Sequence, residues 1–113
     1  MTNLKLVINN SFQKKQKFFV KQELKMILNL YAQKVSSGDW KDYSLSISKK
    51  EVSFDVYQRA SEVPVFRISK NLNPKNKDER FYVLDKLGNI INKSENLNNL
   101  IAKIKRGRLL LVK

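Results

Sequence analysis

The most regular pattern of hydrophobic and polar positions lies between residues 18 and 43. Apolar residues recur there at the i, i+3, i+4, i+7 and i+11 spacing of one helical face. They are Leu24, Ile27, Leu28, Tyr31 and Val35. The pattern predicts an amphipathic helix over about 21–37. Gly38 should end this helix, because glycine readily takes the left-handed conformation that follows a helix C-terminus.

Beyond this helix the pattern changes to the period of two that is typical of β-strands. Alternation over 43–47, 52–56, 63–70, 81–84 and 90–91 predicts about five strands joined by short turns. Pro64 lies near the start of the third strand, which favours an edge strand or the first strand position. The segment 85–89 contains Gly88 and has the length of a hairpin loop.

A second helix is expected after the strands. Ser94 is its predicted N-cap, and its apolar face comprises Leu97, Leu100, Ile101 and Ile104. Weak alternation over 4–8 predicts a short first strand, and 12–17 is a basic connector or a continuation of that strand. The apolar run 109–112 is either a last strand or a tail packed on the sheet.

This order of elements predicts an α+β fold: an antiparallel β-meander of about five strands, with a long N-terminal helix and a shorter C-terminal helix packed on one face. A chain of 113 residues fits one domain. We divide it into an N-terminal strand or basic connector (1–17), a core (18–104) and a basic and apolar tail (105–113).

Composition narrows the chemistry. The chain has no Cys and no His, so disulfides, thiolate nucleophiles and the usual zinc ligands are excluded. It has three glycines and none of the glycine-rich phosphate-binding motifs. We therefore expect a non-enzymatic protein without a cofactor or metal. The sequence lacks a membrane-length apolar segment and a signal-peptide pattern, so we expect a cytoplasmic protein.

The net charge points to a class of partner. It is +13, from 23 Lys and Arg against 10 Asp and Glu, and such an excess attracts polyanions. The chain is also rich in Lys and Asn, which an AT-rich genome imposes on permissive surface positions whatever the function. Both explanations of the charge stay open.

Two groups of basic residues could bind RNA or DNA. Aromatic and Arg side chains on neighbouring strands resemble the stacking surfaces of single-strand RNA binders, and the run 103–108 could bind phosphates or simply complement a helix dipole. The candidate residues are Tyr57, Arg59, Arg67, Lys103, Lys105, Arg106 and Arg108. The alternative is a protein-interaction or homodimerisation module that associates through a strand edge or through 109–112.

The segment 38–43 has two interpretations. In the favoured one, Gly38, Trp40 and Tyr43 are structural anchors where the helix meets the sheet, with the carboxylates between them as turn residues. In the other, Trp40 and Tyr43 line a ligand pocket with Asp39 and Asp42 as its polar contacts. Phe54 and Phe66 are expected in the core, which would turn Tyr57 and Arg67 to the opposite face.

These motifs together resemble a family. The chain has the pattern EL-xx-IL-xx-Y and GDWKDY, then FDVYQR, EVP and FRISK, and finally a G-x-I hairpin. Over about 18–104 it is similar to a small alphaproteobacterial family catalogued as domain of unknown function 2794. The resemblance implies a bacterial cytoplasmic protein and a standalone domain, and it implies no activity, cofactor, partner or site residue. The chain departs from that pattern at Val20, where a capping Asp is expected, and in the loop 71–80.

Overall fold

The alternating segments form one antiparallel sheet in the computed structural model, which describes residues 18–59 and 63–106. The elements in chain order are α2 (Lys21–Ser36), β1 (Asp42–Ile47), β2 (Glu51–Tyr57), β3 (Phe66–Asn71), the 3₁₀ turn η1 (Lys77–Glu79), β4 (Phe81–Leu84), β5 (Ile90–Ser94) and α3 (Leu97–Lys105). The strand predicted over 4–8, the tail 109–112 and Arg108 lie outside the described residues.

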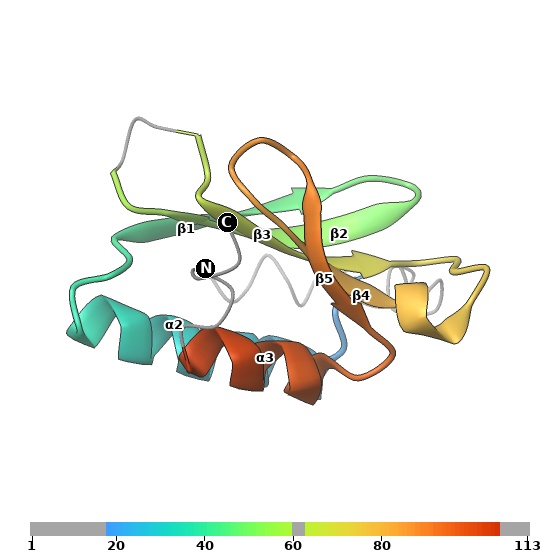
Figure 1. Cartoon of the computed structure of the whole chain (residues 1–113), viewed down its shortest axis with the longest axis horizontal. Coiled ribbons are helices and arrows are strands. Elements are labelled where there is room, and N and C mark those ends of the chain that lie inside the picture. The colour runs from blue at the N-terminus through green and yellow to red at the C-terminus, as the bar shows by residue number, and fades with distance from the viewer. Residues whose placement is uncertain (1–17, 60–62, 107–113) are drawn as a thin grey trace, which may run out of the picture.

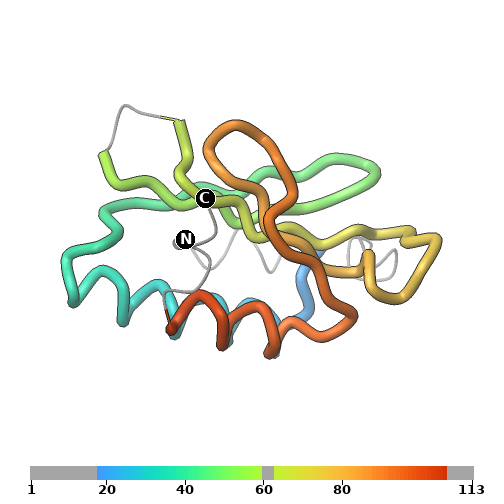
Figure 2. The backbone as a smooth tube through the Cα atoms, viewed as in Figure 1, coloured from blue at the N-terminus to red at the C-terminus, as the bar shows by residue number. Residues whose placement is uncertain are grey.

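The five strands lie in the order β1-β2-β3-β4-β5, and each pairs antiparallel with the next. Both helices cover the same face of this sheet (Figure 1). The α+β meander with a longer N-terminal and a shorter C-terminal helix is therefore confirmed. The backbone trace shows α2 and α3 side by side and running in the same direction (Figure 2).

The core lies between the helices and the middle of the sheet. Phe54 of β2 pairs with Ile68 of β3, which pairs with Val83 of β4, and all three side chains are fully buried. The helices contribute their apolar faces to this row, namely Ile27, Leu30, Leu97, Leu100, Ile101 and Ile104. Burial of each such side chain contributes roughly 1.5–3 kcal/mol relative to exposure, so this layer is the main source of stability.

The C-terminus of α2 closes in a Schellman motif. The Gly38 N–H donates to the Val35 carbonyl (3.0 Å) and the Asp39 N–H to the Lys34 carbonyl (2.9 Å). Gly38 has φ +85°, the left-handed conformation that this motif requires. The predicted helix end at Gly38 is thus confirmed.

The N-terminus of α2 is closed without a capping side chain on Val20. The Glu23 carboxylate accepts the Val20 N–H at 2.8 Å, which is the backward half of a capping box. The same carboxylate accepts a bond from the Lys70 ammonium at 2.9 Å, and that ammonium also donates to the Phe18 carbonyl at 3.1 Å. Lys70 belongs to β3 and is buried, so this ion pair joins the start of α2 to the sheet.

Two expectations at element boundaries were wrong. β3 is the central strand and not an edge strand; it begins at Phe66, so Pro64 precedes it and removes no N–H from the ladder. The N-cap of α3 is Asn96 and not Ser94, which is the last residue of β5. Ser94 Oγ still accepts the Asn96 N–H at 3.0 Å, so the hydroxyl organises the turn before the helix.

Gly38→Ala should lower the free energy of unfolding by about 1 kcal/mol, because an L-residue is strained at this positive φ. An added Cβ meets no heavy atom within 4 Å, so the cost is conformational and not steric. Urea denaturation measures the change. Gly38→Asn serves as the control and should lose less, since Asn tolerates the left-handed region. An unchanged Ala midpoint would contradict this assignment.

Lys70→Met should lower the free energy of unfolding by about 3 kcal/mol, because it leaves the Glu23 carboxylate in a largely buried site without its cation. The two side chains are 9% and 15% exposed. The double variant Glu23→Gln/Lys70→Met should lose clearly less than the sum of the two single variants. Additive losses in chemical denaturation would show that the two groups are not coupled.

Candidate functional site

The sheet has an outer face, which is the face opposite the helices. Because side chains alternate along a strand, the residues that flank the buried Val52, Phe54 and Val56 point to this face, and the strand register continues the row across the neighbours. The outer face includes Ser44, Ser46, Ser53, Asp55, Tyr57, Arg67, Ser69 and Tyr82, and the same register places Glu51, Leu84 and Lys93 on it. It is mostly polar, and its Ser53, Asp55 and Ser69 are buried.

A buried carboxylate organises the centre of the outer face. Asp55 is 2% exposed and accepts hydrogen bonds from Ser46 Oγ and Ser53 Oγ, both at 2.7 Å. The Arg67 Nε lies 3.8 Å from the same carboxylate. A buried carboxylate with two hydroxyl donors and a guanidinium is satisfied, so this network stabilises the pairing of β1, β2 and β3.

The strand candidates for polyanion binding share this face in part. Tyr57 and Arg67 both lie on it, as predicted from their opposition to Phe54 and Phe66, which are buried. The Tyr57 hydroxyl is 3.1 Å from the Oγ of a β1 serine, and Arg67 is paired with the buried carboxylate. Arg59 follows β2 and is exposed. The positive charge at the centre of the outer face is therefore offset by a carboxylate.

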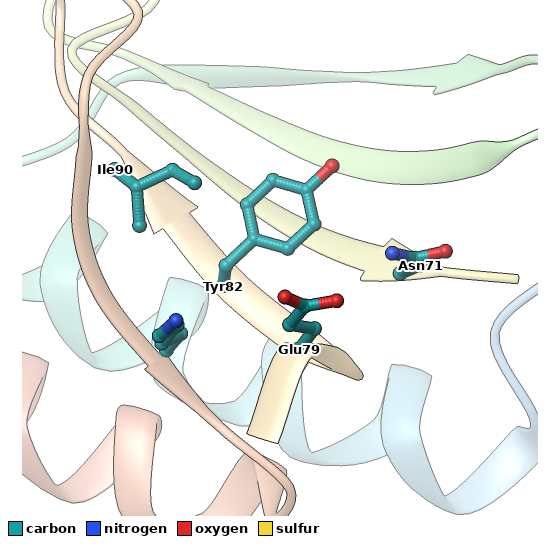
Figure 3. Close-up of a pocket in the computed structure, with 5 residues that line it drawn as sticks. Asn71, Glu79, Tyr82 and Ile90 are labelled. Carbon is teal, nitrogen blue, oxygen red and sulfur yellow. The ribbon is translucent and has the colours of Figure 1, made fainter. Parts of the chain in front are cut away.

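An open cavity of about 260 Å³ lies near the other end of this face, lined by Asn71, Glu79, Tyr82, Ile90 and Lys93. Figure 3 shows the Tyr82 ring rising from β4 between Ile90 and Glu79. The Tyr82 hydroxyl donates to Glu51, and Lys93 lies 3.9 Å from Asp78, so both groups have partners within the protein. The sequence patterns did not reveal this cavity, since only the strand order brings its members together.

The remaining basic candidates lie on the helical side of the molecule. Lys103, Lys105 and Arg106 occupy the end of α3, and the last two are exposed. The Lys103 ammonium reaches the Asn92 Oδ1 of β5 at 3.4 Å. The structure thus brings these three together and separates them from the candidates on β2 and β3, because the sheet lies between the two groups.

The helical layer, meaning α2 and α3, has almost no negative charge. Within these two helices Glu23 is the single acidic residue, and its carboxylate is bound to Lys70. The exposed cations Lys21 and Lys25 of α2 lie on the same layer as those of α3. The basic residues in the last turn of α3 also complement the helix dipole.

The three predicted anchors lie where α2 meets the sheet. Gly38 ends the helix, and Trp40 is 4% exposed with its ring 6.5 Å from Phe66 and 6.3 Å from Tyr31. Tyr43 stacks on the ring of the central β2 phenylalanine at 4.6 Å with an interplanar angle of 6°. These contacts support the interpretation of the anchors as a structural junction.

The two carboxylates between the anchors make local contacts. Asp39 accepts a hydrogen bond from Ser37 Oγ at 2.9 Å, and Asp42 accepts the Tyr43 N–H at 2.8 Å. Asp39 is therefore a turn residue, as the favoured interpretation has it, whereas Asp42 is the first residue of β1 and not a turn residue.

Tyr31 completes this junction. Its ring is edge-on to both Tyr43 (5.0 Å) and Phe54 (5.9 Å). Burial raises the pKa of the Tyr31 phenol above its ordinary value, and the Asp42 carboxylate and Tyr43 add to the rise. The phenol is therefore neutral in the neutral pH range and acts as a packing residue.

Neither a metal centre nor a membrane-spanning helix is found in the part of the chain that the structure describes. Across 18–59 and 63–106, no three acidic side chains converge in a way that could hold a metal ion. The helices in those ranges are too short or too polar to traverse a bilayer.

Comparison with known proteins returned one family. Residues 17–101 match a family described as protein of unknown function (DUF2794). No match was found among curated proteins or among solved structures. The matched residues include α2, all five strands and the first half of α3.

Asp55→Asn should lower the free energy of unfolding by about 2 kcal/mol, because hydrogen bonds to a charged group in a buried site are stronger than those to a neutral amide. Thermal or urea unfolding measures the loss. Asp78→Asn is the matched control: its side chain is 61% exposed, so its ion pair with Lys93 contributes little. Equal effects of the two substitutions would contradict a structural role for the Asp55 network.

Proposed function

We propose a function from the geometry of this chain itself, since the chain belongs to the DUF2794 family, whose description assigns none. The protein is a non-enzymatic module that binds the phosphate backbone of RNA or DNA. The binding surface is the exposed side of the helical layer. The positive charge comes from Lys21 and Lys25 of α2, from Lys105 of α3 and from Arg106, which follows α3.

The observation that supports this proposal is the lack of countercharge on the helical layer. The acidic residue of α2 is turned inward and neutralised by Lys70 at 2.9 Å, while the four cations named above are exposed. Glu95 precedes the start of α3 and so lies at the end of that helix away from Lys105 and Arg106. Because the two helices run in the same direction, it lies at the end where α2 also begins (Figure 2). Within α2 and α3 themselves no carboxylate is exposed, so the cations at the end of α3 are the least offset.

The chemistry of these side chains suits phosphates. Arg106 can donate two parallel hydrogen bonds to one phosphate, whereas the lysines act as mobile point charges. Such contacts position a nucleic acid without reading its sequence. We expect affinity to depend on backbone charge density and salt more than on base sequence. The outer face should contribute less, because Arg67 is neutralised by Asp55.

The test is the salt dependence of binding to labelled duplex DNA and single-stranded RNA, followed by fluorescence anisotropy between about 50 and 200 mM salt. The double variant Lys105→Gln/Arg106→Gln should weaken binding. It should also reduce the slope of log K against log salt by about 0.9 for each duplex phosphate that the variant no longer neutralises. Both residues are exposed, so the fold should be retained, and far-UV circular dichroism checks it.

The matched control is Lys75→Gln/Lys86→Gln. These lysines are exposed in the loop between β3 and η1 and in the β4–β5 loop, so this variant removes the same net charge from outside the helical layer. It should leave the slope nearly unchanged. Equal effects of the two double variants would mean that only net charge matters, and absence of binding at about 50 mM salt would exclude the proposed function.

A further inference from the structure

Across the described residues, the strand β1 forms one edge of the sheet and lacks the Lys, Pro or bulge that often protects an edge. Within the described residues it pairs with β2 alone. Natural edge strands carry Lys, Pro or a bulge that blocks pairing with another chain. The opposite edge strand, β5, contains Lys93 and a register shift against β4. β1, in contrast, has the sequence DYSLSI and an unbroken register with β2.

The side of β1 that faces the helices is apolar and exposed. Tyr43, Leu45 and Ile47 are 41%, 42% and 55% exposed, whereas their register partners on β2 are fully buried. The partners are covered because the helices lie over the middle of the sheet (Figure 1). The apolar face of the sheet therefore continues past the helices to its edge.

α2 extends this apolar area. Tyr31 of α2 contacts the Tyr43 ring at 5.0 Å, which fixes the side of the helix that faces β1. Leu28 and Val35 are three residues before and four residues after Tyr31, so they lie on that same side, and they are 38% and 40% exposed. We call Leu28, Val35, Tyr43, Leu45 and Ile47 together the β1–α2 surface.

We propose that the β1–α2 surface is a homodimer interface, in which β1 pairs antiparallel with β1 of a second copy about a two-fold axis. The pairing satisfies open backbone groups of both edges. It also buries Leu45 and Ile47 of each copy against their counterparts. A two-fold contact uses the same surface on both subunits, and this inference does not depend on nucleic-acid binding.

The charges at the ends of β1 favour a second copy of the same chain as the partner that binds the β1–α2 surface. Asp39 and Asp42 lie at the start of the strand and Lys49 and Lys50 just beyond its end, and all four are exposed. Antiparallel pairing brings the start of one β1 next to the end of the other. Asp39 already pairs with Lys34 at 3.8 Å, so Asp42 is the carboxylate that faces the second copy. In the register that places Leu45 of one copy opposite Ile47 of the other, Asp42 lies opposite Lys50 and Lys41 opposite Glu51, once on each side of the axis.

The net charge of +13 per chain sets the expected salt dependence. Two copies repel each other at long range, and salt screens that repulsion over about 10 Å at 0.1 M. Dimerisation should therefore strengthen or stay constant as salt rises, while phosphate binding weakens. The two activities are distinguishable in the same titration.

The experiment is sedimentation equilibrium of the full chain over a concentration series. The wild-type protein should approach twice its mass of 13.3 kDa at high concentration. Leu45→Lys should raise the dimer dissociation constant at least about tenfold, because the lysine charge lies in the apolar centre of the contact. Leu45 is already half-exposed in the monomer, so the variant should fold, and its circular dichroism spectrum tests that.

Leu87→Lys is the matched control. Leu87 is 84% exposed in the β4–β5 loop, so the same chemical change there should leave the dissociation constant unaltered. A wild-type chain that stays monomeric, or equal effects of both substitutions, would overturn the proposal. So would a Leu45→Lys variant that loses stability as a monomer without any change in mass, because another segment of the same chain would then occupy the edge.

A charge exchange tests the pairing direction. Asp42→Lys should weaken self-association, and so should Lys50→Glu, since each places like charges opposite each other on both sides of the axis. When the two variants are mixed, the heterodimer places the introduced lysine opposite the introduced glutamate. On the other side of its axis the unchanged Lys50 meets the unchanged Asp42. The mixture should therefore form more dimer than either variant alone at equal total concentration, and equal dimer fractions would exclude antiparallel β1 pairing.

Discussion

The structure depends on how much of a five-stranded sheet two helices can cover. α2 and α3 pack over the centre of the sheet, where Phe54, Ile68 and Val83 form a buried row across three strands. The coverage ends at β1, whose apolar side chains stay exposed although they belong to the same face. The core and the exposed edge are thus consequences of one packing arrangement.

A second feature of the molecule is the use of its few carboxylates in internal contacts. Glu23 binds Lys70, Asp55 binds Arg67 and two serines, and Asp39 lies near a lysine in the last turn of α2. Acidic side chains that neutralise partners within the fold leave fewer to balance the exposed cations. Within α2 and α3 themselves no exposed acidic side chain balances the exposed lysines.

The two proposals are geometrically compatible. In antiparallel pairing of two edges, side chains opposite each other lie on the same face of the joined sheet. The helical layers of both copies would then lie on one side of the dimer. The proposed phosphate-binding surface would be doubled on that side, and linked sites of this kind raise the effective affinity for a long polyanion.

The periodic patterns of the sequence determined the elements of this fold, because neighbouring residues largely decide local geometry. Gly38 defined the end of α2, and alternation separated Phe54 from Tyr57 on opposite sides of β2. The tertiary structure alone placed β3 at the centre and turned Lys70 inward to Glu23 across 47 residues of sequence. The tertiary structure also decided three further features: the cavity, the exposed side of β1 and the separation of the α3 cations from the outer face. Strand order and helix coverage arise from contacts between distant segments. The residues along any one segment therefore cannot predict them.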